Sequence, residues 1–540
     1  MILPVDRLRQ LLSESIRRAY PAVGEVEVAI EPAPAERFGH YASSVALKLG
    51  PMVKQPPIEV AQHILAQMGK VSILAKAEVA SPGFINFWLS PKWLMSYAPK
   101  IAADRKFGHN DAGRGGKILV EFISANPTGP MTLGNGRGAF AGDTMSNVLA
   151  ISGWRVSREF YLNDIGQQVN ILAESVIRRY FQFKGIPTEY PDYCYQGEYV
   201  TDLAKQLKID RLKLQDMMTI RDRIKSRILN IMIRDIQRVV AKKLKVEFDR
   251  WVRESSLYAE KLDVKVVDEL RRHDLLAHKD GALWFRTTAF GDDKDRVLIK
   301  KDGEKTYFLS DIALRWDRFA IRGVKREILY LGADHHGYVR RLKAAMAALG
   351  FAHQLDAEIV QLVRLIRDGH EVKMSKRAGT YVTLEEVVDE VGLDAARFFF
   401  LMHAPNTHMD FDITLAKERS EKNPVYYVQY AGARLAGILK NAASLPVQRS
   451  KEPPQPSELR LVKALLYFPT VVAEVAVSHE TQKLPFYSLD LATKFHEFYT
   501  QCRVIDTGTV WAHRLQLVRV TRQVLERVLG LMGVTCPERM

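Results

Sequence analysis

One stretch of this sequence restricts the fold more than any other. Residues 118–122 form an apolar run typical of a buried strand, a glycine-rich segment follows, and residues 136–149 have helical spacing. Residues 154–161 then show the pattern of the next strand. Strand, loop, helix and strand in this order open a doubly wound sheet, so we expect an α/β domain built around parallel strands.

The pattern changes on both sides of this region. Residues 1–108 predict a small α+β domain, and the α/β domain is expected to span residues 109–410. Charged, helical residues at about 165–280 predict an insertion within it. Strand patterns resume near residue 283, and after a hairpin at 368–369 the chain is expected to be helical to its end, with residues 411–540 as a third domain.

Individual elements follow from periodicity and turn signals. In the first domain we expect helices at 8–16 and 58–68 and strands at 26–30, 78–80 and 84–89. Asp368-Gly369 predicts a hairpin turn. Thr383 and Glu386 have the spacing of a capping box at a helix start.

Charge and cysteine content limit the class of protein. Lys plus Arg number 78 and Asp plus Glu 63, which gives a net charge of +15 and indicates a polyanionic partner such as nucleic acid. A solvated basic surface is the alternative. Cys194, Cys502 and Cys536 are far apart, so we expect neither a structural zinc nor a disulfide framework. With no run of 18 apolar residues and no signal-peptide core, we expect a cytoplasmic protein without a membrane segment.

A glycine-rich motif follows the first strand of the α/β domain. Gly134, Gly136 and Gly138 would let the backbone approach a ligand closely, and the free N–H groups of a helix start favour phosphate. The third glycine comes one residue early for a dinucleotide fingerprint, and a purely structural turn is the alternative.

A second motif, Lys-Met-Ser-Lys-Arg, occupies residues 373–377 after the hairpin. Two flexible lysines on a loop can close over a triphosphate and neutralise charge as pyrophosphate leaves. A basic surface loop is the alternative interpretation, which this unusual pentad disfavours.

Together these motifs resemble the class I aminoacyl-tRNA synthetases, whose signatures are His-x-Gly-His after the first strand and Lys-Met-Ser-Lys-Ser after the last. Over nearly its whole length the chain resembles the arginyl-tRNA synthetase family. The order and spacing of several stretches carry the resemblance: 120–130, 161–166, 195–199, 248–251, 307–311, 332–336, 395–398, 423–430 and 537–540. It implies a Rossmann-like catalytic domain, an N-terminal domain that contacts tRNA and an all-α anticodon-binding domain.

Thr132 and Asn135 depart from the family pattern, in which both positions are histidines that contact the ATP phosphates. Threonine and asparagine still donate O–H and N–H bonds. Losing a preorganised donor costs about 10²–10³-fold in rate, so the departure affects the expected speed more than the type of reaction.

The resemblance implies ATP-binding and catalytic residues in both motifs and after a later strand. They are Thr132, Gly134, Asn135, Gly136, His335, Lys373, Met374, Ser375 and Lys376. We expect Mg²⁺ to accompany ATP, and no metal ion held by protein ligands. His335 is equally well interpreted as a hydrogen-bonded loop histidine.

A guanidinium ligand needs fixed carboxylates, because its planar fork binds them bidentately. By resemblance, the arginine-binding residues are Glu121, Asn126, Glu254, Tyr307, Asp311 and Asp334. Tyr307 and Asp311 stand at i and i+4 and would share one helix face, unless Ser310 caps a helix there instead. Each carboxylate taken alone fits an ordinary ion-pair or surface acid equally well.

The C-terminal region contains the candidates for tRNA contact. Tyr427, Tyr430 and Arg434 would share a helix face, and aromatic rings with a guanidinium group suit unstacked bases. Tyr499 lies in a similar stretch, and Met540 matches a chain end that packs by the anticodon in the family. Aromatic filling of a helical core is the alternative.

We therefore expect ATP-dependent attachment of L-arginine to tRNA(Arg) through arginyl-adenylate, by a monomer. Two alternatives stay open. The missing histidines would suit a tRNA-binding paralogue with weakened catalysis, and the motifs alone would also suit a class I synthetase for another amino acid or a plain nucleotidyltransferase.

Overall fold

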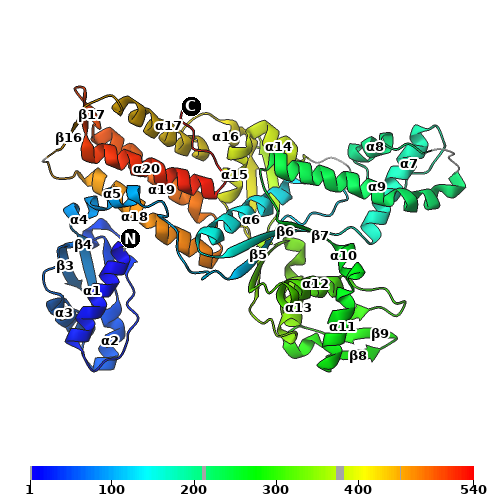
Figure 1. Ribbon diagram of the computed structural model, residues 1–540, viewed down its shortest axis with the longest axis horizontal. Coiled ribbons are helices and arrows are strands. Elements are labelled where there is room, and N and C mark those ends of the chain that lie inside the picture. Colours follow the sequence, from blue (N-terminus) through cyan, green and yellow to red (C-terminus); the bar gives the residue numbers. More distant parts are fainter. Residues whose placement is uncertain (1–2, 210–213, 373–381, 451) are drawn as a thin grey trace.

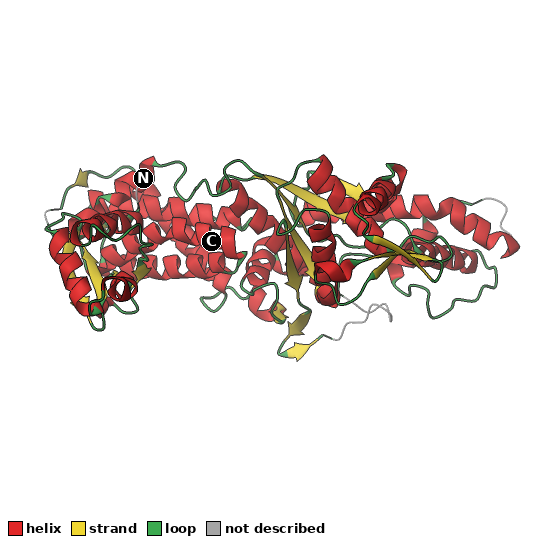
Figure 2. Ribbon diagram, turned by 90° about the horizontal axis from the view of Figure 1, so that it is seen from below, coloured by secondary structure: helices red, strands yellow, loops and turns green. Residues whose placement is uncertain are grey.

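The computed structural model describes residues 3–209, 214–372, 382–450 and 452–540. The molecule is elongated: the N-terminal domain lies at one end, and helices of the central domain project at the other (Figure 1, Figure 2). The C-terminal helices lie beside the N-terminal domain and reach the central sheet.

The N-terminal domain packs helices against an antiparallel sheet. Its helices are α1 (Pro4–Ala19), α2 (Val45–Val53) and α3 (Pro57–Met68), followed by α4 (Pro91–Met95) and α5 (Tyr97–Ala103). The sheet order is β1 (Glu31–Pro32), β2 (Tyr41–Ser43), β4 (Phe84–Leu89), β3 (Leu74–Ala80). The predicted helices and the strand pair β3–β4 are confirmed.

The strand expected at residues 26–30 was wrong. In the part of the chain that the structure describes, these residues are extended but form no strand. The Val28 carbonyl accepts a hydrogen bond from Arg9 Nε at 3.2 Å, and the Ala29 carbonyl accepts one from Ser43 Oγ at 2.7 Å. Side chains thus take acceptors that a sheet partner would use.

A parallel sheet forms the centre of the molecule, as predicted. Its order is β12 (Leu355–Val360), β11 (Arg326–Gly332), β5 (Lys117–Glu121), β6 (Arg155–Leu162), β7 (Arg250–Arg253). All neighbouring strands in this sheet run parallel. Strand order reverses between β5 and β11, and ligands of such sheets bind beside the carboxyl ends at this switch point.

Helix α6 (Leu133–Ile151) begins earlier than the predicted helix at 136–149. Gly134, Gly136 and Gly138 are therefore helical residues and not a loop. Gly142 shows why small residues are needed on this helix: a Cβ there would lie 2.3 Å from the Phe122 ring. Close packing of α6 on the end of β5 follows from these glycines.

The predicted insertion is largely helical but contains a strand. Helices α7 (Gln167–Phe183), α8 (Glu198–Lys205) and α9 (Met217–Arg238) pack around their own apolar cluster and project from the body. Strand β7 lies within the expected helical stretch 165–280 and pairs with β6 at the edge of the central sheet. Its residues, Arg-Trp-Val-Arg, lack the apolar run that marks a central strand.

The rest of the central domain frames the carboxyl ends of the strands. A small antiparallel sheet has the order β10 (Arg296–Ile299), β9 (Ala282–Phe285), β8 (Leu276–Lys279). Beside it lie α10 (Glu254–Ala259), α11 (Leu262–Arg272), the short helix η4 (Thr287–Phe290), α12 (Tyr307–Trp316) with its π-helical continuation η5 (Asp317–Ile321), and α13 (His336–Ala348). Ser310 lies inside α12, so the alternative in which Ser310 caps a helix is wrong; Thr306 is the N-cap.

The predicted hairpin and capped helix both form. Strands β13 (Val363–Arg367) and β14 (His370–Glu371) flank Asp368-Gly369. Helix α14 (Leu384–Val391) starts with Thr383 and Glu386 in a capping box. After α15 (Leu393–Leu401), however, β15 (Met409–Asp412) pairs with β13, so this stretch is not wholly helical.

The C-terminal domain is a helical bundle with a small sheet at one end. Its helices are α16 (Ile413–Lys417), α17 (Pro424–Ala442), α18 (Pro456–Ser478), α19 (Lys483–Gln501) and α20 (Ala512–Leu531), and the sheet is β16 (Val447–Gln448), β18 (Thr509–Trp511), β17 (Ile505–Asp506). Helix α18 has a window of mean hydropathy 1.6, long and apolar enough to cross a membrane, but half of that window is buried. Tyr487 of α19 donates to the Ala464 carbonyl of α18 at 3.0 Å, which places α18 in the bundle core.

Candidate active site

A tight turn follows β5 at the switch point of the sheet. Ile123 and Ser124 both have positive φ, at 66° and 39°. Such backbone is costly for residues other than glycine and is concentrated at functional sites. Ser124 Oγ donates to Glu121 Oε1 at 3.0 Å and accepts from the Tyr161 N–H at 3.1 Å, so the turn is tied to β5 and β6.

A hollow of about 460 Å³ opens beside this turn. Thr132, Gly134 and Asn135 of the first motif line it, as predicted for an ATP site. The remaining lining residues come from the ends of β5, β11 and β12 and from α6: Ile123, Gly138, Tyr330, Leu331, Gly332, Ala333, Val360, Gln361 and Leu362. Gly136 does not line it, contrary to expectation, because Gly136 faces Leu384 of α14 and Phe400 of α15. We call this hollow the slot; glycines and apolar side chains line it together with the polar groups of Thr132, Asn135, Tyr330 and Gln361.

Thr132 and Asn135 bind each other at the start of α6. Asn135 Oδ1 accepts from the Thr132 N–H at 2.8 Å and from Thr132 Oγ1 at 3.1 Å. These two donors fix the oxygen of the Asn135 amide, so its NH₂ group points away from Thr132. The Thr132 hydroxyl thus donates its hydrogen to Asn135, and the NH₂ group of Asn135 remains as a donor for a ligand.

The second motif, which contains the predicted residues Lys373, Met374, Ser375 and Lys376, lies outside the described residues. The chain on either side of it is placed. The Val372 N–H donates to the Leu365 carbonyl at 2.9 Å, and the Leu384 N–H donates to the Met131 carbonyl at 3.0 Å. Thr383 forms a β-bridge with Thr132. Thr383 and Leu384, at the start of α14, therefore lie beside the helix start that lines the hollow.

Asp311 lies buried on α12 and is held from two sides. Arg315 Nη1 donates to Asp311 Oδ1 at 2.9 Å, and the Tyr338 hydroxyl of α13 donates to Asp311 Oδ2. Burial raises the pKa of the Asp311 carboxyl, while Arg315 acts in the opposite direction. Tyr307 stands one turn away on the same helix, as its i, i+4 spacing predicted, and its ring lies 5.9 Å from that of Tyr338. Tyr338 was missed because no pattern links residues on separate helices.

The Glu121 carboxylate is bound inside the protein. Its Oε2 lies 2.6 Å from Arg318 Nη1 and 3.8 Å from Arg315 Nη2. Arg318 also pairs with Glu159 and with Glu327, the latter at 2.6 Å. Glu121 thus belongs to an internal ion cluster with Arg315 and Arg318, and its contact with arginine stays a prediction.

This cluster carries an excess of negative charge. In the described part of the chain, five carboxylates face three guanidinium groups: Asp311, Glu121, Glu159, Glu327 and Asp317 against Arg315, Arg318 and Arg322. Burial raises the pKa of Asp311 and Glu327, whereas Arg318 and Arg322 overcome burial and lower the pKa of Glu159. A cationic ligand would offset the excess.

Glu254 is the second buried acid of this region, and we call Asp311 and Glu254 the acidic wall. Glu254 is buried at the start of α10 and accepts a hydrogen bond from Ser310 Oγ at 2.7 Å. Burial raises the pKa of Glu254, and Asp311 and Asp164 raise it further. Ser310 also contacts the Tyr258 hydroxyl at 3.1 Å. Ser310, the residue before Asp311 on α12, thus ties Glu254 to the helix that carries Asp311.

Two predicted arginine contacts stay predictions. Asn126 is exposed beyond the turn after β5 and donates to Gln168 Oε1 at 2.9 Å. Asp334 and His335 belong to the short helix η6 (Ala333–His335) at the end of β11. His335 does not line the 460 Å³ hollow; its ring lies 6.2 Å from that of Tyr338. The structure places His335 toward the acidic wall and not in the hollow.

The tyrosines predicted to contact tRNA gather on α17 and α19. Arg434 Nη2 donates to the Tyr430 hydroxyl at 2.8 Å, and the Arg434 guanidinium also lies 4.6 Å from the centre of the Tyr499 ring. His496, which sequence patterns missed, stacks 5.9 Å from Tyr430 and lies 5.0 Å from Tyr427. We call Tyr427, Tyr430, Arg434, His496 and Tyr499 the aromatic face. It is half exposed, unlike core filling.

Met540 lies on a separate hollow of about 820 Å³. Tyr426 and Gln429 of α17 line this hollow with it. Tyr426 stacks on Tyr430 at 6.5 Å, so the hollow adjoins the aromatic face.

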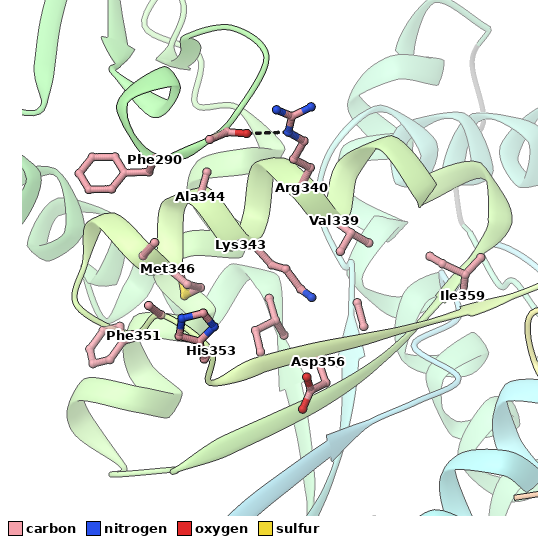
Figure 3. Close-up of a pocket in the computed structure, with 15 residues that line it drawn as sticks. Phe290, Val339, Arg340, Lys343, Ala344, Met346, Phe351, His353, Asp356 and Ile359 are labelled. Atoms are coloured by element: carbon pink, nitrogen blue, oxygen red, sulfur yellow. Dashed lines mark hydrogen bonds between the residues drawn. The ribbon is translucent and has the colours of Figure 1, made fainter. Parts of the chain in front are cut away.

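A further hollow of about 700 Å³ follows α13 and the edge strand β12 (Figure 3). Lys343 of α13 and Asp356 of β12 lie across it, and Arg340 Nε donates to the Gly291 carbonyl at 2.5 Å. None of the predicted ATP- or arginine-binding residues lines it.

Among the residues that the structure describes, no group of three or more His, Cys, Asp or Glu side chains could hold a metal ion.

Three family models match successive parts of the chain. The arginyl-tRNA synthetase N-terminal domain matches residues 6–89, and the catalytic domain of class I tRNA synthetases (R) matches residues 99–409. The DALR anticodon-binding domain matches residues 428–540. The three matches follow one another in the order of the three structural units.

Relatives match over the full length. An arginine–tRNA ligase of Geobacillus kaustophilus (strain HTA426) is 39% identical over 556 residues, and that of Geobacillus thermodenitrificans (strain NG80-2) is 41% identical over 557 residues; both alignments cover 99% of this chain and 100% of the relative. The solved arginyl-tRNA synthetase of Thermus thermophilus is 21% identical with a TM-score of 0.78, covers all of both chains and shares the fold. This chain belongs to the arginyl-tRNA synthetase family.

Proposed function

We propose that this protein attaches L-arginine to tRNA(Arg) in two steps, with ATP in the switch-point hollow and the arginine side chain at the acidic wall. The observation that carries this assignment is a buried carboxylate, Asp311, with acceptor capacity left over in a cluster of excess negative charge. Such a group suits a guanidinium ligand. Family membership gives the reaction, and the geometry supports the division of the site.

In the first step the arginine carboxylate attacks the α-phosphorus of ATP. A bond forms between the carboxylate oxygen and phosphorus, the bond to the bridging oxygen breaks, and pyrophosphate leaves with the electron pair. Asn135 donates its amide N–H groups to phosphate oxygens, and the N-terminus of α6 adds its dipole. Lys373 and Lys376 supply positive charge for the leaving pyrophosphate.

In the second step a ribose hydroxyl of the terminal adenosine of tRNA attacks the acyl carbon. The ester bond forms, the bond to phosphate breaks, and AMP leaves. Glu254 and Asp311 hold the arginine side chain throughout, so catalysis is mainly positioning and electrostatic stabilisation. The aromatic face and Met540 bind bases of the anticodon.

Aminoacylation tests this function. Purified protein receives ATP, Mg²⁺, tRNA from a matching source and each labelled amino acid in turn. We expect arginine alone to become attached to tRNA. Attachment of another amino acid would overturn the acidic-wall assignment. Tight tRNA binding without any attachment would favour the catalytically weakened paralogue that the replaced histidines allow.

A further inference from the structure

The two hydrogen bonds of Asp311 use only part of its acceptor capacity. A carboxylate accepts about four hydrogen bonds, two on each oxygen. Arg315 uses one acceptor position on Oδ1, and the Tyr338 hydroxyl uses one on Oδ2. Each oxygen can therefore accept one more hydrogen bond, and a ligand guanidinium binds a carboxylate through both of its oxygens.

We propose that Arg315 is a positioning residue for arginine recognition: it fixes the Asp311 carboxylate and keeps it ionised, so that the site favours a guanidinium group over an uncharged ureido group of the same shape. This inference rests on the proposed role of Asp311.

Arg315 is itself held rigidly, which a positioning role requires. Its side chain is 2% exposed. Besides Asp311 Oδ1, its Nη1 bonds the Asp311 carbonyl at 3.2 Å, and its Nη2 lies 3.2 Å from Glu327 Oε1 at the start of β11. Arg315 therefore links the acid on α12 to the floor of the central sheet, and Asp311 cannot turn without breaking this link.

The charge of Arg315 also affects the protonation of Asp311. Besides Arg315, the charged and titratable groups around Asp311 are Arg318 of η5, Glu121 of β5, Glu254 of α10, Tyr161 of β6, Tyr307 of α12 and Tyr338 of α13. Burial favours the protonated acid, and Arg315 is the strongest influence in the opposite direction. Without Arg315, Asp311 would hold its proton to a higher pH. A protonated acid loses its attraction for a guanidinium but can donate to a ureido oxygen.

The test compares Arg315→Met with Arg322→Met. Arg322 belongs to the same cluster but pairs with Glu159 and Asp317, at 2.8 and 2.7 Å, and not with Asp311. For Arg315→Met we expect the KM for arginine to rise about 10- to 100-fold, the range for a hydrogen bond to a charged group, with the KM for ATP within about twofold of wild type. The acid limb of the arginine KM against pH moves to higher pH, and the ratio of the citrulline inhibition constant to the arginine KM falls. Arg322→Met leaves all of these at wild-type values.

An equal rise in arginine KM for both variants, or an unshifted acid limb in Arg315→Met, would overturn the proposal. Arg315→Lys covers the case in which Arg315→Met does not fold, which melting curves reveal. Lysine keeps the charge but cannot bridge Asp311 and Glu327 as a fork, so we expect a rise of less than about tenfold with an unshifted acid limb. An unchanged KM or a shifted limb would contradict the proposal. If Asp311→Asn leaves arginine KM unchanged, the role of Asp311 fails instead.

Discussion

The two ends of the proposed site differ in the charge of the groups that line them. The nucleotide end is a narrow slot of glycines and apolar side chains, in which Asn135 and the start of α6 offer neutral donors. The amino-acid end is a wall of buried carboxylates anchored by buried guanidinium groups. ATP brings negative charge, which neutral N–H donors at a helix start can bind and which Lys373 and Lys376 are proposed to neutralise. Arginine brings a cation to a dry site, which needs a compensating charge.

This difference explains which changes each end tolerates. Thr132 and Asn135 replace both family histidines, yet the pair forms its own capped helix start and keeps an amide donor. At the proposed amino-acid end the charges are buried in one connected cluster, so removing one changes the charge balance of all its buried partners. Single substitutions should therefore be costlier at the acidic wall.

The largest effect is expected from Asp311→Asn. Losing the carboxylate leaves the guanidinium of the bound arginine without its charged partner, which costs about 3–4 kcal/mol. The kcat/KM for arginine should therefore fall about 100- to 1000-fold with little change in the KM for ATP. Asp317→Asn is the control, because Asp317 pairs with Arg322 at the far side of the cluster. Steady-state aminoacylation measures both, and equal losses in the two variants would contradict the assignment.

Asn135→Asp should affect the other end. The carboxylate can still accept from the Thr132 N–H, so the helix start is kept, but the donor becomes a negative charge facing phosphates. We expect kcat/KM for ATP to fall about 100-fold with little change in the KM for arginine. Asn135→His, which installs the family residue, should keep activity. An active Asn135→Asp enzyme would show that Asn135 does not contact ATP.

Tyr430→Ala tests the aromatic face. Stacking of one base is worth about 1–3 kcal/mol, so the KM for tRNA should rise about tenfold while the KM values for ATP and arginine stay unchanged. Phe486→Ala is the control, because Phe486 is 51% exposed at the opposite end of α19 from Tyr499. A similar rise in both variants would assign the effect to the helix and not to the face.

Lowering the pH should weaken arginine binding, with a smaller effect than the substitutions above. Burial raises the pKa values of Asp311 and Glu254, so both carboxyls take up protons at higher pH than free carboxyls do. As pH falls through these raised values the wall loses negative charge, and the KM for arginine should rise several-fold. The profile should flatten in Asp311→Asn. An identical profile in that variant would assign the titration to another group.

The smallest effect concerns the glycines of α6. A Cβ on Gly136 would lie 2.6 Å from Leu384 Cδ1 and 3.2 Å from the Phe400 ring, whereas one on Gly134 would meet only Thr132 Oγ1, at 3.9 Å. Gly136→Ala should therefore destabilise the fold by about 1 kcal/mol with the KM for ATP preserved. Gly134→Ala should keep the melting temperature and raise the KM for ATP. The reverse pattern would place Gly136 in the slot.

Sequence patterns predicted what depends on near neighbours. The helix that carries Tyr307 and Asp311, the hairpin at Asp368 and the capping box at Thr383 all depend on residues within a few positions. Changes of pattern along the chain predicted the division into domains of different class, and the family resemblance agreed with it. Each of these features is local or shared with relatives.

Features that depend on distant residues escaped prediction. The ion pair between Glu121 and Arg318 joins residues almost two hundred positions apart, and no sequence pattern shows it. Strand β7 was hidden by its charged residues, because an edge strand needs no continuous apolar run. The partnership of Asp311 with Tyr338 joins two helices whose relative placement no sequence period shows.

The most direct test of the division between the two ends is a crossed measurement. The KM values for arginine and for ATP are determined in Asp311→Asn and in Asn135→Asp under identical conditions with saturating tRNA. The account predicts that Asp311→Asn raises only the arginine KM and that Asn135→Asp raises only the ATP KM. Parallel changes of both constants in both variants would contradict it, because they would mean that the acidic wall and the slot are one inseparable site.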